Sequence, residues 1–97
     1  MRSKQTEKIL LNSLRVYEHF LAAHYSYGRV IPGKNISNPF SSAKQQTPSF
    51  NVYKGSDGSY MFNDYATGDQ GSVFVFVMRM KKTTYQNAVK IINQIIQ

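Results

Sequence analysis

The sequence contains no cysteine among its 97 residues. This absence excludes disulfides, thiolate nucleophiles, iron–sulfur clusters and every zinc site that depends on cysteine. The two histidines, His19 and His24, cannot complete a zinc site by themselves, and their spacing is not the i, i+4 spacing of a helical metal pair. We interpret both as ordinary helix residues and expect neither a metal ion nor a cofactor.

Long apolar runs are absent as well. No run of apolar residues reaches the ~20 positions that a membrane-spanning helix needs. Residues 1–5 lead into a polar, charged stretch rather than the apolar core of a signal peptide. We therefore expect a cytoplasmic protein without a membrane partner. The length suits one compact domain, and a composition that is 41% hydrophobic and 13% aromatic is typical of a folded chain.

Acidic residues are scarce and unevenly distributed. The chain carries 5 Asp and Glu against 12 Lys and Arg, which gives a formal net charge of +7. Residues 29–54 and 79–97 contain bases but no acid, whereas residues 55–78 contain acids but no base. Clustered Lys and Arg side chains neutralise phosphates and release counterions, so this pattern indicates a polyanion partner. The alternative is a basic surface that only keeps the protein in solution.

The N-terminal part of the chain is predicted to be helical over residues 5–26. Leu10, Leu14 and Leu21 recur on one face at helical spacing. Gly28 is expected to end the helix, because glycine tolerates the positive φ that often follows a last turn.

Residues 49–64 are predicted to form a β-hairpin around an Asp-Gly turn. Apolar and polar residues alternate on both sides of this turn. The alternation predicts that Phe50 and Val52 point inward, while Tyr53 and Met61 point outward.

The C-terminal third contains one clear helix and one ambiguous segment. Residues 84–96 are predicted to be helical, with Thr84 as the N-cap. Residues 65–72 are predicted to be a glycine-bearing loop. For residues 73–80, the β-branched and aromatic composition favours a strand, whereas Ser72 as an N-cap favours a helix.

Catalysis finds little support in the sequence. There is no cysteine nucleophile, and no Ser-His-Asp arrangement can be singled out from scattered hydroxyls and two helix histidines. Asp64 and Asp69 could hold magnesium as paired carboxylates, but across a loop they are more typical of turn residues. The spacing Gly68-x-x-Gly71 is too weak a signal for a phosphate loop. We expect a protein that is not itself an enzyme.

Several short motifs follow one another in a characteristic order over residues 30–96. In chain order they are Asn38-Pro39-Phe40, Thr47-Pro48-Ser49-Phe50, the hairpin, Asp64-Tyr65-Ala66-Thr67-Gly68-Asp69 and Gly71-Ser72. This order resembles the CHC2-type zinc-ribbon domain at the N-terminus of bacterial and phage DNA primases. That family shows a Cys-Pro-Phe-His box, a Thr-Pro-Ser-Phe box, a hairpin, a Cys-x-x-Cys-Gly box, a Gly-Asp and then two short helices.

The resemblance implies that the zinc ligands have been lost. The ligand positions of the family fall on Asn38, Ser41, Asp64 and Thr67, and none of these is Cys or His. A structural zinc contributes on the order of 10 kcal/mol to a small domain, so its loss must be offset. Our hypothesis is a polar cluster in which Asp64 accepts hydrogen bonds from Ser41, Thr67 and the amide of Asn38. The alternative is that all four residues are turn residues that face solvent.

The resemblance also implies a fold. The segment after the Gly-Asp of the family is helical, so residues 73–80 are expected to form a helix against their local propensity. The expected fold class is α+β, with an N-terminal helix within residues 1–28. Residues 29–97 would form the metal-free primase zinc-ribbon-like part, with a small antiparallel sheet and two C-terminal helices. Both parts are expected to make one compact domain.

The function implied by the resemblance is recognition of single-stranded DNA. The ribbon of a primase helps to engage the template, while catalysis resides in a separate magnesium-binding domain that 97 residues cannot hold. We expect a non-catalytic module in the replication of a phage, plasmid or other mobile element.

Basic residues in loops and exposed tyrosines are the candidates for DNA contact, because single strands are held by basic grooves with aromatic faces. The candidates for phosphate contact are Arg29, Lys34, Lys44 and Lys54, and those for base stacking are Tyr53 and Tyr65. Phe40 and Phe50 are assigned to the core. Arg79, Lys81 and Lys82 form a second basic patch, which the dipole of a helix end is enough to explain.

Two alternative functions stay open at this point. The chain could be a protein–protein adaptor in a replication or mobilisation complex, if the nucleic-acid role was lost with the zinc. It could also be the N-terminal fragment of an active DNA primase. The protein partners we expect are a primase, a helicase or another replication protein.

Overall fold

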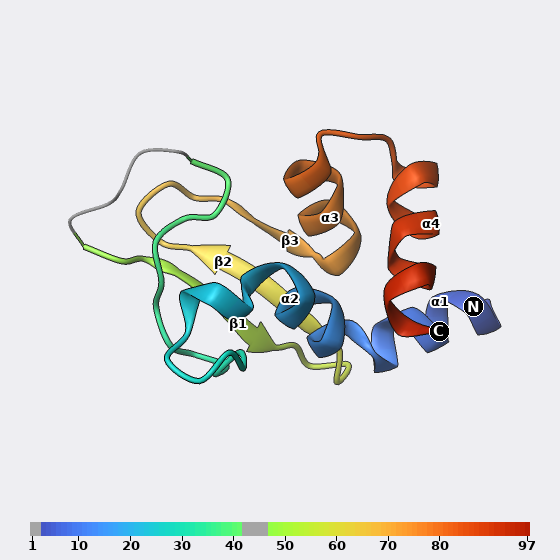
Figure 1. Cartoon of the computed structure of the whole chain (residues 1–97), viewed down its shortest axis with the longest axis horizontal. Helices are drawn as coiled ribbons and strands as arrows, with labels where there is room; N and C mark the ends of the chain where they lie inside the picture. Colours follow the sequence, from blue (N-terminus) through green and yellow to red (C-terminus); the bar gives the residue numbers. More distant parts are fainter. Residues whose placement is uncertain (1–2, 42–46) are drawn as a thin grey trace.

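The computed structural model describes residues 3–41 and 47–97, and its fold is the expected α+β arrangement (Figure 1). Two N-terminal helices precede a three-stranded sheet, and two helices follow it. The elements are α1 (Lys4–Leu11), α2 (Ser13–Leu21), the 3-10 turn η1 (Ala22–His24), β1 (Phe50–Lys54), β2 (Tyr60–Asp64), β3 (Gln70–Ser72), α3 (Val73–Lys81) and α4 (Tyr85–Ile96).

The sheet is antiparallel throughout, with the strand order β1-β2-β3. The predicted hairpin is confirmed, and its turn contains Gly58 at a φ of 89°. A further extended segment lies along the free edge of β1. There the N–H of Gly33 donates to the carbonyl of Val52 at 2.7 Å, and Ile36 forms an isolated antiparallel bridge with Phe50.

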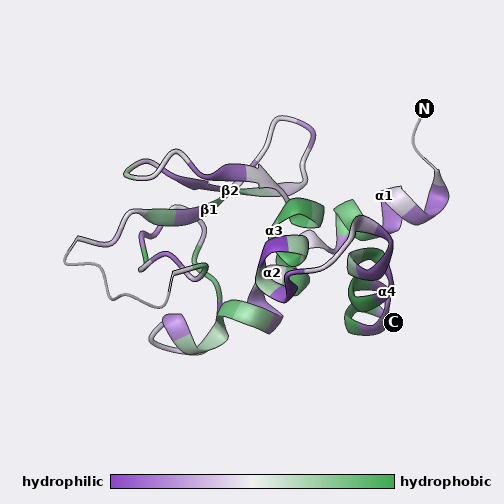
Figure 2. Cartoon of the chain, turned by 90° about the horizontal axis from the view of Figure 1, so that it is seen from above, coloured by the Kyte–Doolittle hydropathy of each residue, from purple (hydrophilic) through white to green (hydrophobic). Residues whose placement is uncertain are grey.

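The core forms between the inner face of the sheet and the helices. Phe50, Val52 and Phe62 point inward and are fully buried, together with Tyr17 of α2 and Phe76 of α3. The ring centroids of Phe62 and Phe76 lie 6.0 Å apart, and those of Tyr17 and Phe76 lie 4.6 Å apart. In Figure 1 α2 crosses in front of the sheet, and Figure 2 shows the helices gathered on that side.

The predicted N-terminal helix is broken at Asn12, which corrects the expected continuous helix over residues 5–26. The Nδ2 of Asn12 donates to the carbonyl of Lys8 at 2.8 Å, and the next residue, Ser13, donates its Oγ to the carbonyl of Leu10 at 2.8 Å. Polar side chains that satisfy nearby carbonyls compete with the helical ladder, so α1 ends here and α2 starts in a new direction. Regular helix then ends at Leu21 rather than at residue 26.

The predicted loop over residues 65–72 contains a short strand, β3, which the sequence analysis missed. Gly71 permits it, because a Cβ at this position would lie 3.0 Å from the Cβ of Val75 and 3.2 Å from the ring of Phe62. Ser72 then caps α3 by accepting from the N–H of Val75 at 3.5 Å. The helix expected over residues 73–80 is confirmed, as is the one over residues 84–96 with Thr84 as its N-cap.

Ser13 ties the N-terminal helices to the sheet and generates the first prediction. This buried hydroxyl donates to Leu10 and accepts from the backbone N–H of Tyr60 at 2.9 Å. Ser13→Ala would leave that N–H without its acceptor, at a cost of about 1–3 kcal/mol. Urea unfolding measures the loss, with Ser26→Ala at an exposed position as the control. Equal unfolding free energies for the two variants would contradict this role of Ser13.

Candidate functional site

The carboxylate of Asp64, at the C-terminal end of β2, is buried and surrounded by hydrogen-bond donors. Its Oδ2 accepts from the Nδ2 of Asn38 at 2.8 Å. Its Oδ1 accepts from the Oγ of Ser49 at 2.6 Å and from the backbone N–H groups of Ala66 and Thr67 at 2.9 and 3.2 Å. Three loops therefore converge on one side chain that is fully buried.

Asp69 extends this network toward α3. Its Oδ2 accepts from the Nδ2 of Asn38 at 3.1 Å and from the Oγ1 of Thr67 at 2.9 Å. Its Oδ1 accepts from the Nη1 of Arg79 at 2.6 Å, and the guanidinium of Arg79 lies 4.1 Å from the ring centroid of Phe40. We call Asn38, Ser49, Asp64, Thr67, Asp69 and Arg79 the Asp64 cluster.

The Asp64 cluster holds both carboxyl groups in the ionised form. Burial by itself would raise the pKa of Asp64, but the hydrogen bonds from Ser49, Asn38 and the two backbone N–H groups outweigh it, so this pKa lies below its ordinary value of 3.8. The hydrogen bond from Arg79 lowers the pKa of Asp69, and the hydrogen bonds from Thr67 and Asn38 add to it. The negative charges of these two neighbouring carboxylates are thus stabilised mainly by hydrogen-bond donors, and the guanidinium of Arg79 in α3 adds one positive charge.

The cluster differs in membership from the hypothesis made on the sequence. The hydroxyl that donates to Asp64 belongs to Ser49, and Thr67 reaches Asp64 through its backbone N–H rather than its side chain. Ser41 is exposed, and its backbone N–H donates to the carbonyl of Asn38 at 3.3 Å. Ser49, Asp69 and Arg79 were not anticipated. The only sequence feature that could have pointed to Ser49 was its place in the Thr-Pro-Ser-Phe motif, next to a phenylalanine assigned to the core.

The four residues named as candidate ligand positions in the sequence do not fit a zinc ion. Structural zinc is bound by thiolates and imidazoles, and Asn38, Ser41, Asp64 and Thr67 supply neither. The carboxylate of Asp64 is already engaged by four donors, and the described residues contain no group of three or more His, Cys, Asp or Glu side chains that could hold a metal.

The face of the sheet that points away from the core carries a second set of candidate residues. We call this face the open sheet face. Two rows of side chains cross the strands there. The first row is Asn35, Asn51, Asn63 and Gln70, and the second row is Tyr53, Met61 and Ser72. Strand register pairs the members of each row that lie in β1, β2 and β3. Asn35 joins the first row because its Oδ1 accepts from the Nδ2 of Asn51 at 3.2 Å. All of these residues are exposed or half-buried.

The structure places the DNA-contact candidates in different surroundings. Tyr53 lies on the open sheet face with 37% of its surface exposed, and Lys54 follows it at the end of β1. Lys34 lies in the segment beside β1, and Arg29 lies in the preceding loop; both are exposed. Tyr65 is more exposed, at 61%, but its hydroxyl donates to the carbonyl of Pro48 at 3.2 Å, close to the Asp64 cluster. Lys44 lies outside the described residues.

Asp64 generates the second prediction. Asp64→Asn would replace one accepting oxygen by a donor that faces other donors, and we expect a loss of about 3 kcal/mol or more in the free energy of unfolding. Asp57→Asn serves as the matched control, because Asp57 lies in the exposed hairpin turn; its variant should lose less than about 1 kcal/mol. Chemical unfolding followed by circular dichroism measures both.

Thermal unfolding of the wild-type protein tests the metal-free interpretation of the cluster. The melting temperature of the wild-type protein should be the same with and without EDTA. A melting temperature that fell on addition of EDTA, or an Asp64→Asn variant as stable as Asp57→Asn, would contradict it.

The lowered pKa values of Asp64 and Asp69 generate the third prediction. A carboxyl group whose pKa is lower in the folded than in the unfolded state stabilises the fold at pH values above the unfolded pKa. This contribution is lost as the pH falls through the folded pKa. The free energy of unfolding should therefore be constant above about pH 5 and fall steadily toward pH 2. The Asp64→Asn/Asp69→Asn variant should show a shallower acid dependence than wild type. Parallel curves would contradict the assignment.

Among the residues that the structure describes, no helix is long and apolar enough to cross a membrane.

Comparison with protein-family models shows the family of this chain. Residues 33–97, more than half of the chain, match the family model of the CHC2 zinc finger. Neither the curated proteins nor the solved structures contain a significant match. With its motif order, its hairpin and its two C-terminal helices, the chain belongs to the CHC2 zinc finger family, the primase-type zinc ribbon, in a form without cysteine.

Proposed function

We propose that this chain is a non-catalytic module that binds single-stranded DNA across its open sheet face. The observation that carries the proposal is the pair of adjacent rows on that face, one of amides and one led by Tyr53. A CHC2 zinc finger points to a primase-related nucleic-acid-binding module, and a zinc ribbon alone is not catalytic. The preference for single strands over duplex is part of the proposal and rests on the two rows.

The amide row suits the edges of unpaired bases. Each Asn or Gln side chain offers both a donor and an acceptor, and the Watson–Crick edges of bases are accessible only when the strand is single. The register places Asn63 directly between Asn51 and Gln70. A strand that runs across the sheet would therefore meet neighbouring amides at a spacing of about 5 Å, the distance between strands.

The second row suits the faces of bases. Tyr53 pairs with Met61 across the hairpin, which places an aromatic ring beside a flexible thioether on the accessible side of the sheet. Stacking of a base on an aromatic side chain contributes about 1–3 kcal/mol per base and tolerates any sequence. Bases inside a duplex are already stacked on one another, so this contact favours single strands.

Charge supports the same partner. The two rows contain no acidic residue, and the exposed Lys34 lies in the segment along the edge of β1. The exposed Lys54 ends β1, where strand alternation places it on the side of Phe50 and Val52, and the exposed Arg29 lies in the loop before the edge segment. With a net charge of +7 the chain attracts polyanions at long range. Lys44 stays a candidate for phosphate contact on its position in the sequence. Tyr65 is the weaker stacking candidate, because its hydroxyl is hydrogen-bonded beside the Asp64 cluster.

The proposed setting is DNA replication of a phage, plasmid or other mobile element, in the cytoplasm. The module would act beside a primase or helicase, or as the N-terminal part of a longer primase. It would deliver or hold the template strand, while another domain or protein performs the chemistry. We propose that Asn38, Ser41, Asp64 and Thr67 mark the positions that zinc ligands occupy in other members of the family.

Fluorescence anisotropy of a labelled single strand of about 20 nucleotides tests the proposal and gives the fourth prediction. We expect tighter binding to the single strand than to its duplex. Tyr53→Ala should weaken it about tenfold, from the loss of one stacked base. Lys34→Ala/Lys54→Ala should weaken binding and reduce the slope of log K against log salt concentration by about 1.4, at about 0.7 per lost phosphate contact.

The matched controls are Tyr27→Ala and Lys8→Ala, which remove an exposed tyrosine and an exposed lysine outside the sheet. Neither should change the affinity by more than about twofold. The proposal fails if the duplex binds as well as the single strand, if nothing binds at low salt, or if Tyr53→Ala behaves like Tyr27→Ala.

A further inference from the structure

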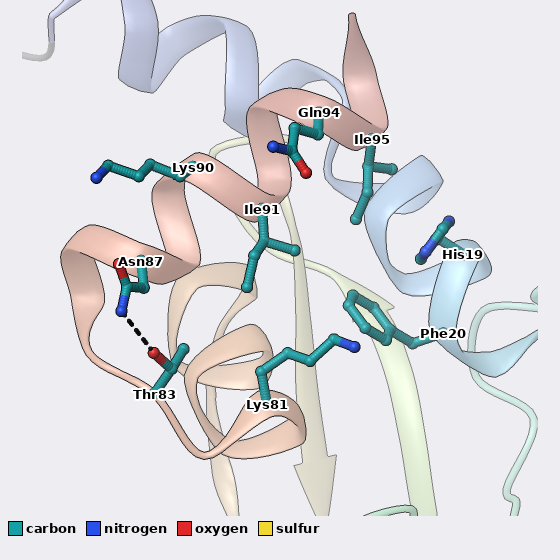
Figure 3. A pocket seen from close by; sticks show the side chains of 9 residues that line it. All are labelled: His19, Phe20, Lys81, Thr83, Asn87, Lys90, Ile91, Gln94 and Ile95. Carbon is teal, nitrogen blue, oxygen red and sulfur yellow. Dashed lines mark hydrogen bonds between the residues drawn. The ribbon is translucent and has the colours of Figure 1, made fainter.

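A groove of about 620 Å³ opens between α2, the end of α3 and α4, on the helical side of the molecule (Figure 3). Its floor is apolar. Figure 3 shows the side chains of Phe20, Ile91 and Ile95 pointing into the same hollow, and each is only partly buried although it packs against the core. A groove of this volume can hold several side chains of a ligand.

The rim of the groove is polar and basic. It consists of His19, Lys81, Thr83, Asn87, Lys90 and Gln94. No lining residue is acidic, and among the described residues neither Lys81 nor Lys90 forms an ion pair. Glu18 lines an adjoining hollow, where its Oε2 accepts from the backbone N–H of Val30 at 3.1 Å. The groove therefore presents unpaired positive charge above an apolar floor.

The groove joins two parts of the chain. Its wall on α2 comes from His19 and Phe20, which lie outside the residues that match the CHC2 zinc finger, whereas its other walls lie within them. The matched region of this chain therefore does not form the groove alone, because α2 supplies one wall.

The floor of the groove suits an apolar side chain better than a nucleobase. A nucleobase needs an open aromatic face, but the ring of Phe20 is contacted by His19 at 5.0 Å and by Phe76 at 5.8 Å between centroids, and the Nζ of Lys81 lies 5.7 Å over it. The two isoleucines offer aliphatic surface, which suits an apolar side chain.

We propose that this groove docks an acidic, amphipathic segment of a partner protein. An apolar side chain of the segment would sit against Phe20, Ile91 and Ile95, and its carboxylates would face Lys81 and Lys90. A helix in a groove, held by an apolar anchor and flanking charge, is a common way to recognise a peptide. The site is independent of the open sheet face, so the module could hold DNA and a partner at the same time.

Selection from a displayed library of random peptides tests the proposal and gives the fifth prediction. The library is panned on the wild-type protein and counter-selected on Lys81→Glu/Lys90→Glu. The enriched peptides should combine Asp or Glu with Leu, Ile or Phe. In titrations of labelled protein followed by NMR, the best peptide should shift the amide signals of Phe20, Lys90 and Ile91.

The affinity of that peptide should fall about tenfold or more in Lys81→Glu/Lys90→Glu, and it should weaken with salt. Lys4→Glu/Lys8→Glu, which makes the same change in net charge on α1, should leave the affinity within about twofold. Single-stranded DNA binding should be retained by Lys81→Glu/Lys90→Glu to the same extent as by this control.

Three outcomes would overturn the proposal. The library could yield no enriched peptide, or peptides without an excess of acidic residues. The selected peptide could bind both double variants equally. Finally, Lys81→Glu/Lys90→Glu could abolish DNA binding while the control retained it, which would make the groove a nucleic-acid site.

Discussion

A carboxylate removed from water must be met by donors, and the arrangement of the loops around Asp64 follows from that requirement. The segment that carries Asn38, the start of β1 at Ser49 and the turn after β2 each supply at least one donor. Asn38 also reaches Asp69, which in turn binds Arg79 of α3. The cluster thus joins both ends of the hairpin to the helical layer. Hydrogen bonds to Asp64 and Asp69 therefore hold these loops together at one end of the sheet.

The fold divides the molecule into two surfaces of different character. The alternation of the strands places Phe50, Val52 and Phe62 in the core and leaves amides and Tyr53 on the other side. The helices cover the inner face and use their remaining apolar residues, Ile91 and Ile95, to line a groove far from that polar side. The α2 wall of this groove comes from His19 and Phe20, and the hydrogen bond from Tyr60 to Ser13, the first residue of α2, ties this helix to the sheet.

The sequence predicted the hairpin and the two C-terminal helices, but it missed β3, the break at Asn12 and most of the contacts between elements. Period-two alternation predicted the hairpin, and the order of motifs predicted α3 against the strand propensity of its valines and phenylalanines. The break at Asn12 was missed because it depends on side-chain hydrogen bonds to particular carbonyls, which an apolar period does not report. Asn38 and Asp64 could be named from their motif positions. Arg79 could not, because a base in a last helical turn is already explained by the dipole, and only the packing of α3 on Phe40 brings it to Asp69. The amide row depends on strand register, which the turn sets.

The contacts of α4 carry a consequence for the order in which the chain folds. Both α1 and α2 contact α4, and the hydrogen bond from Tyr60 to Ser13 joins residues far apart in the chain. The N-terminal helices leave the ribosome first, yet the surfaces that they need are synthesised last. During synthesis they must wait, with Val16, Tyr17 and Leu21 exposed, until the sheet and α4 have emerged. Apolar residues exposed in this way make a nascent chain prone to aggregation until the rest of the domain has been synthesised.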